Sequence, residues 1–198
     1  MSKTYVKSIF EGRRRTYINL CLTTIIRDAY NVSTKQMIYE VAEKEVCNWD
    51  DKKTLYCFDI LVKPDQKDSM RVIFQHTLNH LLPLQARLGK RIIPVYVLKR
   101  LPGTVDWHTT NSNESTFSFS GRGFEGKAIS IIPFADYIAN ELALPLVDET
   151  GLTGKYDIAT ENTLRSESDV LTALKKLGLT VEKEKREMDV VIISKQFY

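Results

Sequence analysis

The sequence lacks a long hydrophobic run. Its longest uninterrupted apolar stretch, residues 92–98, holds seven residues and includes a proline, whereas a membrane-spanning helix needs roughly 20. The first ten residues contain lysines but no hydrophobic segment of the kind found in signal peptides. We therefore expect a chain that does not span a membrane. It is either cytoplasmic or begins after a removed export signal.

A strong charge of one sign is also missing. The 198 residues carry 28 Lys and Arg against 25 Asp and Glu, a net charge of +3, which is too small to indicate a nucleic-acid partner. The one tight basic cluster, residues 13–15, is interpreted as a solvated strand or turn. The apolar fraction of 43% is ordinary for a globular protein. A chain of this length can form one large domain or two small ones.

Patterns that carry chemistry are few. His76 and His80 have the spacing of metal ligands on a helix, but the residues between them lack the glutamate of a zinc peptidase helix. A Gly-x-Gly-x-x-Gly pattern at residues 121–126 follows an alternating polar and apolar strand, so it is interpreted as a mobile loop rather than a dinucleotide site. No Gly-x-Ser-x-Gly sequence is present, and His108 lies in a polar linker. We expect no catalytic residues, no metal and no cofactor.

The cysteines are also few and widely spaced. Cys21, Cys47 and Cys57 have no Cys-x-x-Cys spacing and do not identify the redox compartment. In an exported protein, Cys47 and Cys57 are the pair most able to form a disulfide, because they flank a polar loop that folds back. The interpretation we favour is three free, mostly buried thiols. Trp49, in the same loop, is interpreted as a lid over a small core, with an exposed anchor for a partner as the alternative.

Hydrophobic periodicity predicts an order of elements that occurs twice. Residues 20–100 show helix, strand, loop, a strand containing Phe58-Asp59-Ile60, helix and hairpin. Residues 129–194 repeat this order, with Tyr156-Asp157-Ile158 in the corresponding strand. The two hairpins are expected to turn at Gly89-Lys90 and at a charged stretch near residue 186. We interpret the pattern as an internal duplication, with repeats at residues 1–102 and 103–198.

This order predicts the α+β fold class, in two similar halves. In each half, helices pack on one face of a small, largely antiparallel sheet. Helices are expected over residues 22–30, 69–82, 131–142 and 169–177, and further strands over residues 5–10, 15–19, 36–41, 55–62 and 116–120.

A glycine-bearing stretch, residues 144–158, organises the second repeat. An apolar strand leads into Asp148, two glycines then break the chain, and an alternating strand follows. Gly151 and Gly154 are expected where φ is positive or the backbone turns sharply. Asp148 and Thr150 have short side-chain oxygens that can accept hydrogen bonds from the backbone amides of such a turn. We expect this stretch to be structural.

The same stretch resembles a family motif. The pattern Val-Asp-x-Thr-Gly-Leu-x-Gly-x-Tyr-Asp, met at residues 147–157, is similar to that of an uncharacterised bacterial extracytoplasmic family, a domain of unknown function abundant in soil bacteria. The chain departs from the family by having Asn48 where Asp is usual and by a shorter loop after residue 100. Other segments that resemble the family are Asn48-Trp49, Phe58-Asp59-Ile60, Ile93-Pro94-Val95-Tyr96, Leu177-Gly178-Leu179 and Asp189-Val190-Val191-Ile192.

The resemblance implies export, and association with membrane-sensor metallopeptidases or thioredoxin-like domains. It also implies halves similar to the short N-terminal domain of secretins and TonB-dependent receptors, a binding module. We therefore expect a periplasmic or otherwise extracytoplasmic, non-catalytic interaction module that binds a protein or peptide at the bacterial cell envelope. The alternative is a small-molecule sensor or an accessory domain of a membrane peptidase or thioredoxin-like redox partner. The residues expected to form its structural motif are Trp49, Asp59, Asp148, Thr150, Gly151, Gly154, Tyr156 and Asp157.

Overall fold

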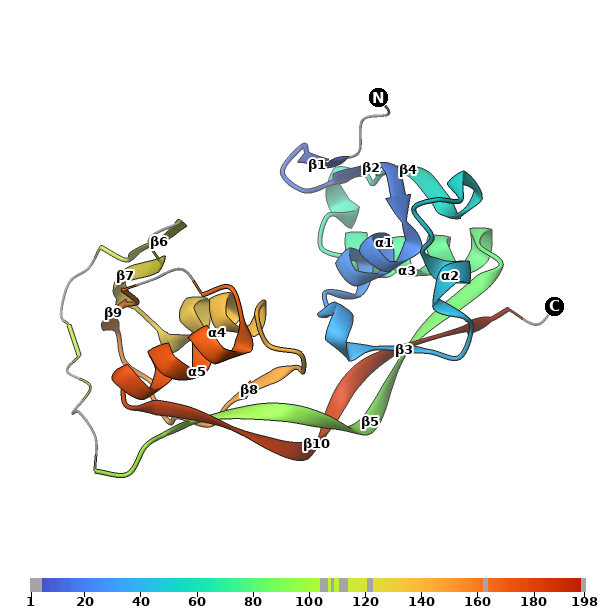
Figure 1. The fold of residues 1–198 in the computed structure, drawn as a ribbon. Coiled ribbons are helices and arrows are strands. Elements are labelled where there is room, and N and C mark those ends of the chain that lie inside the picture. Colours follow the sequence, from blue (N-terminus) through green and yellow to red (C-terminus); the bar gives the residue numbers. More distant parts are fainter. Residues whose placement is uncertain are drawn as a thin grey trace. The chain divides into compact units, whose positions relative to one another are not determined.

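The computed structural model describes residues 5–103, 107, 109–110, 114–120, 123–161 and 164–196. These residues contain five α-helices and ten β-strands, and the strands form three sheets. The fold class is therefore α+β, as predicted (Figure 1). The chain divides into two compact units. The first comprises Met1–Arg91 and Met188–Tyr198, and the second comprises Ile92–Glu187. No helix among the described residues has the length and apolar character of a membrane span.

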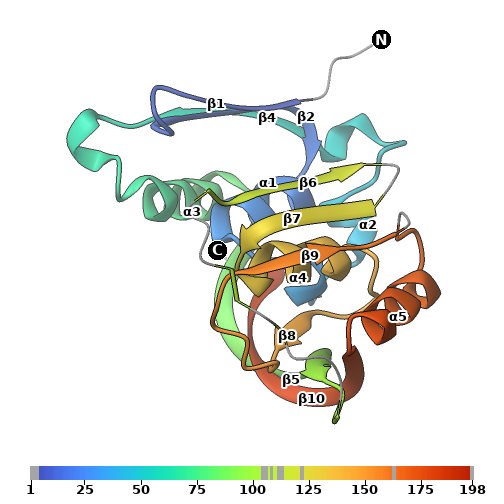
Figure 2. The same ribbon diagram turned by 90° about the vertical axis from the view of Figure 1, so that its left-hand side faces the viewer.

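The first unit is built on an antiparallel sheet with the order β1-β2-β4. Two helices cover one face of this sheet (Figures 1 and 2). Tyr17 and Phe58 from the sheet contact Phe74 from a helix, with ring centroids 5.4 and 6.4 Å apart. The elements of this layer are β1 (Tyr5–Ile9), β2 (Arg14–Cys21), β4 (Leu55–Leu61), α1 (Leu22–Tyr30) and α3 (Met70–Leu81).

Sequence periodicity explains how α1 packs. Leu22, Ile25, Ile26 and Ala29 recur at the 3, 4 and 7 spacing of one helical face, and all four are buried. The helix ends at Asn31, whose φ of 54° is left-handed. Shorter elements of this unit are β3 (Met37–Tyr39) and α2 (Glu43–Val46). The sequence predicted only a polar loop where α2 forms.

The second unit has a corresponding antiparallel sheet, with the order β6-β7-β9. Helices α4 and α5 lie on one face of it (Figure 1). Phe124 from the sheet packs against Phe134 from α4 at a ring distance of 5.3 Å. The elements are β6 (Thr116–Ser120), β7 (Gly123–Ile129), β8 (Leu146–Asp148), β9 (Tyr156–Ala159), α4 (Ile131–Ala139) and α5 (Glu167–Lys176).

Two long strands run from one unit into the other. β5 (Leu84–Arg100) and β10 (Leu179–Lys195) are neighbours in a sheet of order β3-β10-β5-β8. The two predicted hairpins are therefore wrong. Gly89 does not turn the chain, because it lies inside β5, where a Cβ atom would come within 2.9 Å of Ile192 Cδ1. The charged stretch near Arg186 is likewise part of a strand.

The compact units do not follow the predicted boundary at residues 102 and 103. The reason is that β10 returns to the first unit, where Val191 pairs with Met37 in parallel register. Likewise β5 extends into the second unit, where Tyr96 pairs with Leu146. The interpretation of residues 121–126 as a loop is also wrong for its described part, because β7 begins at Gly123. Gly121 and Arg122 lie outside the described residues, as does His108.

The element order over β6–β10 is β-β-α-β-β-α-β, and β1–β5 have the same order except that the short helix α2 lies between β3 and β4. Each second strand has a register shift, between Tyr17 and Leu20 in β2 and between Gly126 and Ile129 in β7. The residue that pairs with Leu20 is Tyr56, and the one that pairs with Ile129 is Tyr156. The predicted correspondence of the two aromatic-Asp-Ile tripeptides therefore does not hold, because Tyr156 corresponds in position to Tyr56. The similarity of the two halves stays a prediction.

Candidate functional site

A disulfide fixes the start of the loop that carries Trp49. Cys47, directly after α2, is bonded to Cys21 at the end of β2, with Cα atoms 4.9 Å apart. The predicted pairing of Cys47 with Cys57 is wrong, and so is the expectation of three free thiols. Cys57 is free and exposed. It alternates along β4 with Tyr56 and Phe58, which pack on the core, so its side chain lies on the opposite face of the sheet.

Hydrogen bonds hold the rest of this loop, residues 47–54, which we call the Trp49 loop. The amide of Asn48 donates to Thr54 Oγ1 at 3.0 Å, and the Thr54 hydroxyl donates to the Asn48 carbonyl at 2.7 Å. Asn48 Oδ1 accepts from the amide of Asp50 at 3.1 Å. An aspartate at position 48 could accept the same bond. Asn48 therefore provides the same hydrogen-bond acceptor as the aspartate usual in the family.

Trp49 itself is 57% exposed. Its interpretation as a lid over a small core is wrong, and the alternative, an exposed side chain, agrees with the structure. The polar groups of the loop bond to one another at its base, so they fix the backbone without covering the indole ring.

Asp59 forms an ion pair across the first sheet. Its carboxylate accepts from Arg14 Nε at 2.9 Å and from the Arg14 Nη2, and also from the Thr16 hydroxyl at 3.0 Å. The hydrogen bond from Arg14 is the main reason that the pKa of Asp59 lies below its ordinary value, and Thr16 lowers the pKa further. All three side chains lie on neighbouring strands, in the register of β2 with β4. This arrangement joins two strands and leaves no reactive group free.

The first part of the glycine-bearing stretch is a hydrogen-bonded turn. Asp148 Oδ1 accepts from the amide of Thr150 at 2.9 Å, and Thr150 Oγ1 accepts from the amide of Leu152 at 3.2 Å. Gly151, between them, has a φ of 68°, which favours glycine. Thr150 is buried. Both predicted acceptors therefore bond the backbone amides of the turn.

Gly154 is required for a different reason. It does not have a positive φ, but a Cβ atom there would lie 2.5 Å from Thr109 Cγ2 and 2.9 Å from the Tyr156 hydroxyl. Its amide donates to that hydroxyl at 3.1 Å. The ring of Tyr156 is buried and meets Trp107 edge to face at 5.4 Å. Glycine at position 154 thus provides room for these neighbours.

Asp157, on β9, supports the register shift of β7. Its Oδ1 accepts from the amide of Ala128 at 2.8 Å. The second unit therefore contains Asp148, Thr150, Gly151, Gly154, Tyr156 and Asp157 in successive local contacts, whereas Asp59 and Trp49 belong to separate places in the first. The polar atoms of the glycine-bearing stretch bond backbone amides, which is the arrangement of a structural motif.

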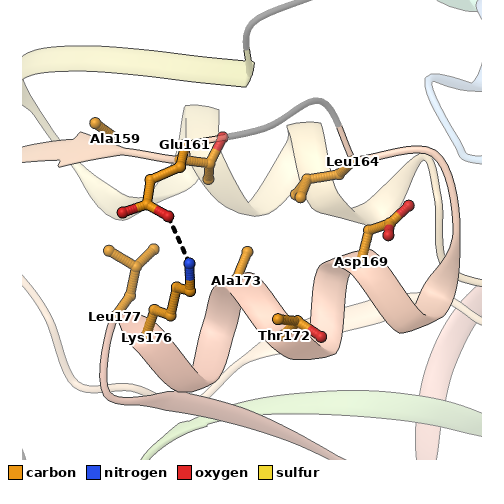
Figure 3. A pocket seen from close by; sticks show the side chains of 9 residues that line it. Ala159, Glu161, Leu164, Asp169, Thr172, Ala173, Lys176 and Leu177 are labelled. Carbon is orange, nitrogen blue, oxygen red and sulfur yellow. Dashed lines mark hydrogen bonds and ion pairs between the residues drawn. The ribbon is translucent and has the colours of Figure 1, made fainter.

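A pocket of about 280 Å³ lies beside α5 in the second unit (Figure 3). An ion pair between Glu161 and Lys176 joins the segment after β9 to the helix, and the hydrogen bond from Lys176 lowers the pKa of Glu161. Asp169 accepts from the hydroxyl of Ser166 at 2.8 Å. The polar groups at this pocket are thus bonded to their own neighbours. The apolar lining residues are Ala159, Leu164, Ala173 and Leu177.

His76 and His80 are exposed on α3. In the described part of the chain, no group of three or more His, Cys, Asp or Glu side chains is placed to hold a metal ion. Sequence reasoning placed Phe117 and Phe119 in a strand but did not indicate that both rings are exposed.

These features define an α+β protein in which the polar side chains of the sequence motifs bond the backbone of turns and join neighbouring strands. The chain belongs to the family described as protein of unknown function (DUF3738), whose family model matches residues 23–195. The matched region includes the Trp49 loop and the glycine-bearing stretch. Comparisons with curated proteins and with solved structures found no match.

Proposed function

We propose that the protein is a non-catalytic interaction module that binds a protein or peptide partner through the Trp49 loop, outside the cytoplasm at the bacterial cell envelope. The observation that carries the proposal is an exposed tryptophan on a loop whose backbone is fixed. Trp49 is 57% exposed, while a disulfide and paired hydrogen bonds hold the residues on either side of it.

Physical chemistry favours such a loop as an anchor. Tryptophan is enriched among the few residues that supply most of the binding energy at protein interfaces, because its large ring removes much apolar surface from water. Binding through a flexible loop loses part of that energy to the ordering of the loop. A loop that is already fixed avoids this loss, so its contact energy is retained as affinity.

The location rests on the disulfide and on the family resemblance. Disulfides form and persist in oxidising compartments and are rare in the cytoplasm. The Cys21–Cys47 bond therefore supports an extracytoplasmic site. The alternative function, a small-molecule sensor, has less support. At the pocket beside α5, Glu161 and Lys176 bond one another and Asp169 bonds Ser166, so these charged side chains are engaged by their neighbours rather than set around a shared ligand position.

The experiment is site-specific photocrosslinking in the organism that encodes the protein. A photoreactive amino acid at position 49 is expected to give one discrete adduct with a second protein or peptide. Position 81 is the matched control, because Leu81 is also a large apolar residue of the first unit, 64% exposed. Absence of an adduct at position 49, or the same adducts from both positions, would overturn the proposal.

A second arm tests whether the indole ring supplies the affinity. Trp49→Ala should keep the melting temperature of the wild type, because the ring is mostly solvated, and should abolish co-purification of the crosslinked partner. Undiminished co-purification by this variant contradicts a role for Trp49.

A further inference from the structure

Within the described residues, one strand of the second unit pairs with another strand on one side only. β6 is the outer strand of the sheet β6-β7-β9, and all five of its residues are exposed (Figure 2). Its described neighbour is β7, which pairs with it from Thr116 to Ser120 in antiparallel register. In such a strand, every second residue directs its backbone N–H and C=O away from the neighbouring strand. The hydrogen-bonding pattern on that side matches another extended backbone.

The side chains of β6 make this edge apolar on one face. Phe117 stacks on Phe124 at a ring distance of 6.2 Å, and Phe119 lies 5.8 Å from the ring of Tyr137 on α4. The core of the second unit therefore contacts one side of each ring. The other side stays open, since Phe117 is 53% and Phe119 65% exposed. Two such rings, side by side on one strand, form an apolar stripe that a neighbouring strand can cover.

β6 also lacks the residues that usually protect an edge. Natural edge strands commonly carry a lysine, another charged side chain or a proline, which disfavours pairing with a second molecule. The corresponding outer strand of the first unit, β1, has an exposed Lys7 at its centre. The sequence of β6 is Thr-Phe-Ser-Phe-Ser, without charge or proline. Nothing in this strand acts against association.

The same five residues are complementary to themselves. When two antiparallel copies pair about Ser118, Phe117 of each copy lies opposite Phe119 of the other, and Thr116 lies opposite Ser120. A two-fold axis requires this reciprocity of contacts. Directly opposed aromatic pairs on one face stabilise antiparallel strands. A shift of one residue would set phenylalanine against serine. A shift of two residues would oppose only one ring of each copy, so pairing about Ser118 is the register in which all four rings are opposed.

We propose that β6 is a self-association edge, at which a second copy of this chain adds its own β6 antiparallel about Ser118. The two sheets then continue as one of order β9-β7-β6-β6-β7-β9. An in-plane continuation keeps the faces of both sheets aligned, so the four phenylalanine rings lie on the face that carries α4 in each copy. This inference concerns the second unit and does not rest on the proposed role of Trp49.

The dimer is expected to be weak. Stable interfaces bury roughly 1,200–2,000 Å² in total, and contacts at or below the lower end are transient. A strand of five residues contributes a short interface. We therefore expect association to depend on concentration, with monomer at low and dimer at high concentration.

Sedimentation of the full chain over a concentration series is the first test. The wild type should shift from monomer toward dimer, and Phe119→Lys should stay monomeric because it places a charge at the edge. Phe10→Lys is the control, because Phe10 is a phenylalanine of the first unit that is also more than half exposed, and it should behave as the wild type. A monomeric wild type at every concentration overturns the proposal.

Cysteine crosslinking tests the register. In a Cys57→Ser background, Ser118→Cys should form an intermolecular disulfide on mild oxidation, because position 118 faces itself across the axis. Thr116→Cys is the control, since two copies of position 116 lie four residues apart along the paired strands. Equal crosslinking of both variants, or none at position 118, overturns the register. If Ser118→Cys fails while an added extended peptide binds at β6, the occupant is a foreign strand and the self-association is wrong.

Discussion

The carboxylate of Asp157 accepts a hydrogen bond from the amide of Ala128, at 2.8 Å, and Ala128 has a φ of 51°. The first unit has a similar contact. Asn19 in β2 also has a φ of 51°, and its amide donates to Cys57 Sγ at 3.4 Å. Each left-handed residue lies three positions before a helix, α1 or α4. A side chain from the adjacent strand thus holds the backbone where it leaves the sheet for the helix.

Asp157→Ala should lower the free energy of unfolding by about 1–3 kcal/mol, because it leaves the buried amide of Ala128 without an acceptor. Asp157→Asn keeps an acceptor oxygen and should lose less. Urea unfolding of the three proteins measures the difference. Equal losses in both variants would show that the amide is satisfied in another way.

Gly151→Ala and Gly154→Ala should both destabilise the protein, for different reasons. The first places a methyl group at a φ of 68° with open space around it, a strain of about 1–2 kcal/mol. The second places a methyl group against Thr109 Cγ2. Thr109→Ser removes that methyl group and should partly restore Gly154→Ala in thermal unfolding. It should leave Gly151→Ala unchanged, and rescue of both variants would contradict the distinction.

Loss of the disulfide should be costly. Cys21 and Cys47 are 26 residues apart, and closing a loop of this length contributes about 3–4 kcal/mol by restricting the unfolded chain. Cys21→Ala with Cys47→Ala should therefore unfold at a clearly lower urea concentration than the wild type. Cys57→Ser is the control and should change little, because a hydroxyl can also accept from Asn19.

Alkylation of free thiols tests the Cys21–Cys47 disulfide directly. Protein purified without reductant, alkylated and digested should carry one labelled cysteine, Cys57, because the other two are bonded. Three labelled cysteines would contradict the disulfide and remove one support for the extracytoplasmic location.

The ion pair of Asp59 with Arg14 predicts a dependence of stability on pH. The pKa of Asp59 is lower in the folded protein than in the unfolded chain, so the folded state binds the proton more weakly. The stabilisation is present above the unfolded pKa and is lost as the pH falls through the folded pKa. Asp59→Asn should remove this part of the acid dependence in unfolding measured from pH 6 down to pH 2.

A double variant provides the control for that assignment. Arg14→Gln should remove the same part of the pH dependence, and adding Asp59→Asn to it should have no further effect. Independent, additive changes would show that Asp59 does not titrate through Arg14.

Local patterns predicted much of the fold. The limits of α1 and β6 follow from hydrophobic spacing and agree with the structure. The predicted turn at Gly89 failed because a glycine that gives room to Ile192 has the same local sequence as one that turns the chain. The turn predicted at the charged stretch of β10 was also wrong. Lys99 and Glu182 pair across the two strands at 2.7 Å, so these charges belong to the exposed side of a sheet.

The candidate sites depended on contacts that sequence spacing does not contain. Asp148 and Thr150 bond amides two residues away, and such local acceptors can be predicted from the order of residues. The choice of Cys21 as the partner of Cys47 depends on where a distant strand ends. The exposure of Trp49 likewise depends on how the loop lies over its neighbours.

The course of β10 sets an order of events during synthesis. Val191 and Ile193 belong to the core that contains Tyr17 and Phe74, yet they leave the ribosome after the whole of the second unit. Until then, the first hundred residues lack a strand of their own sheet and keep part of their apolar surface uncovered. The first unit to be made is thus the last to be completed, and the nascent chain depends on its final strand to bury that surface.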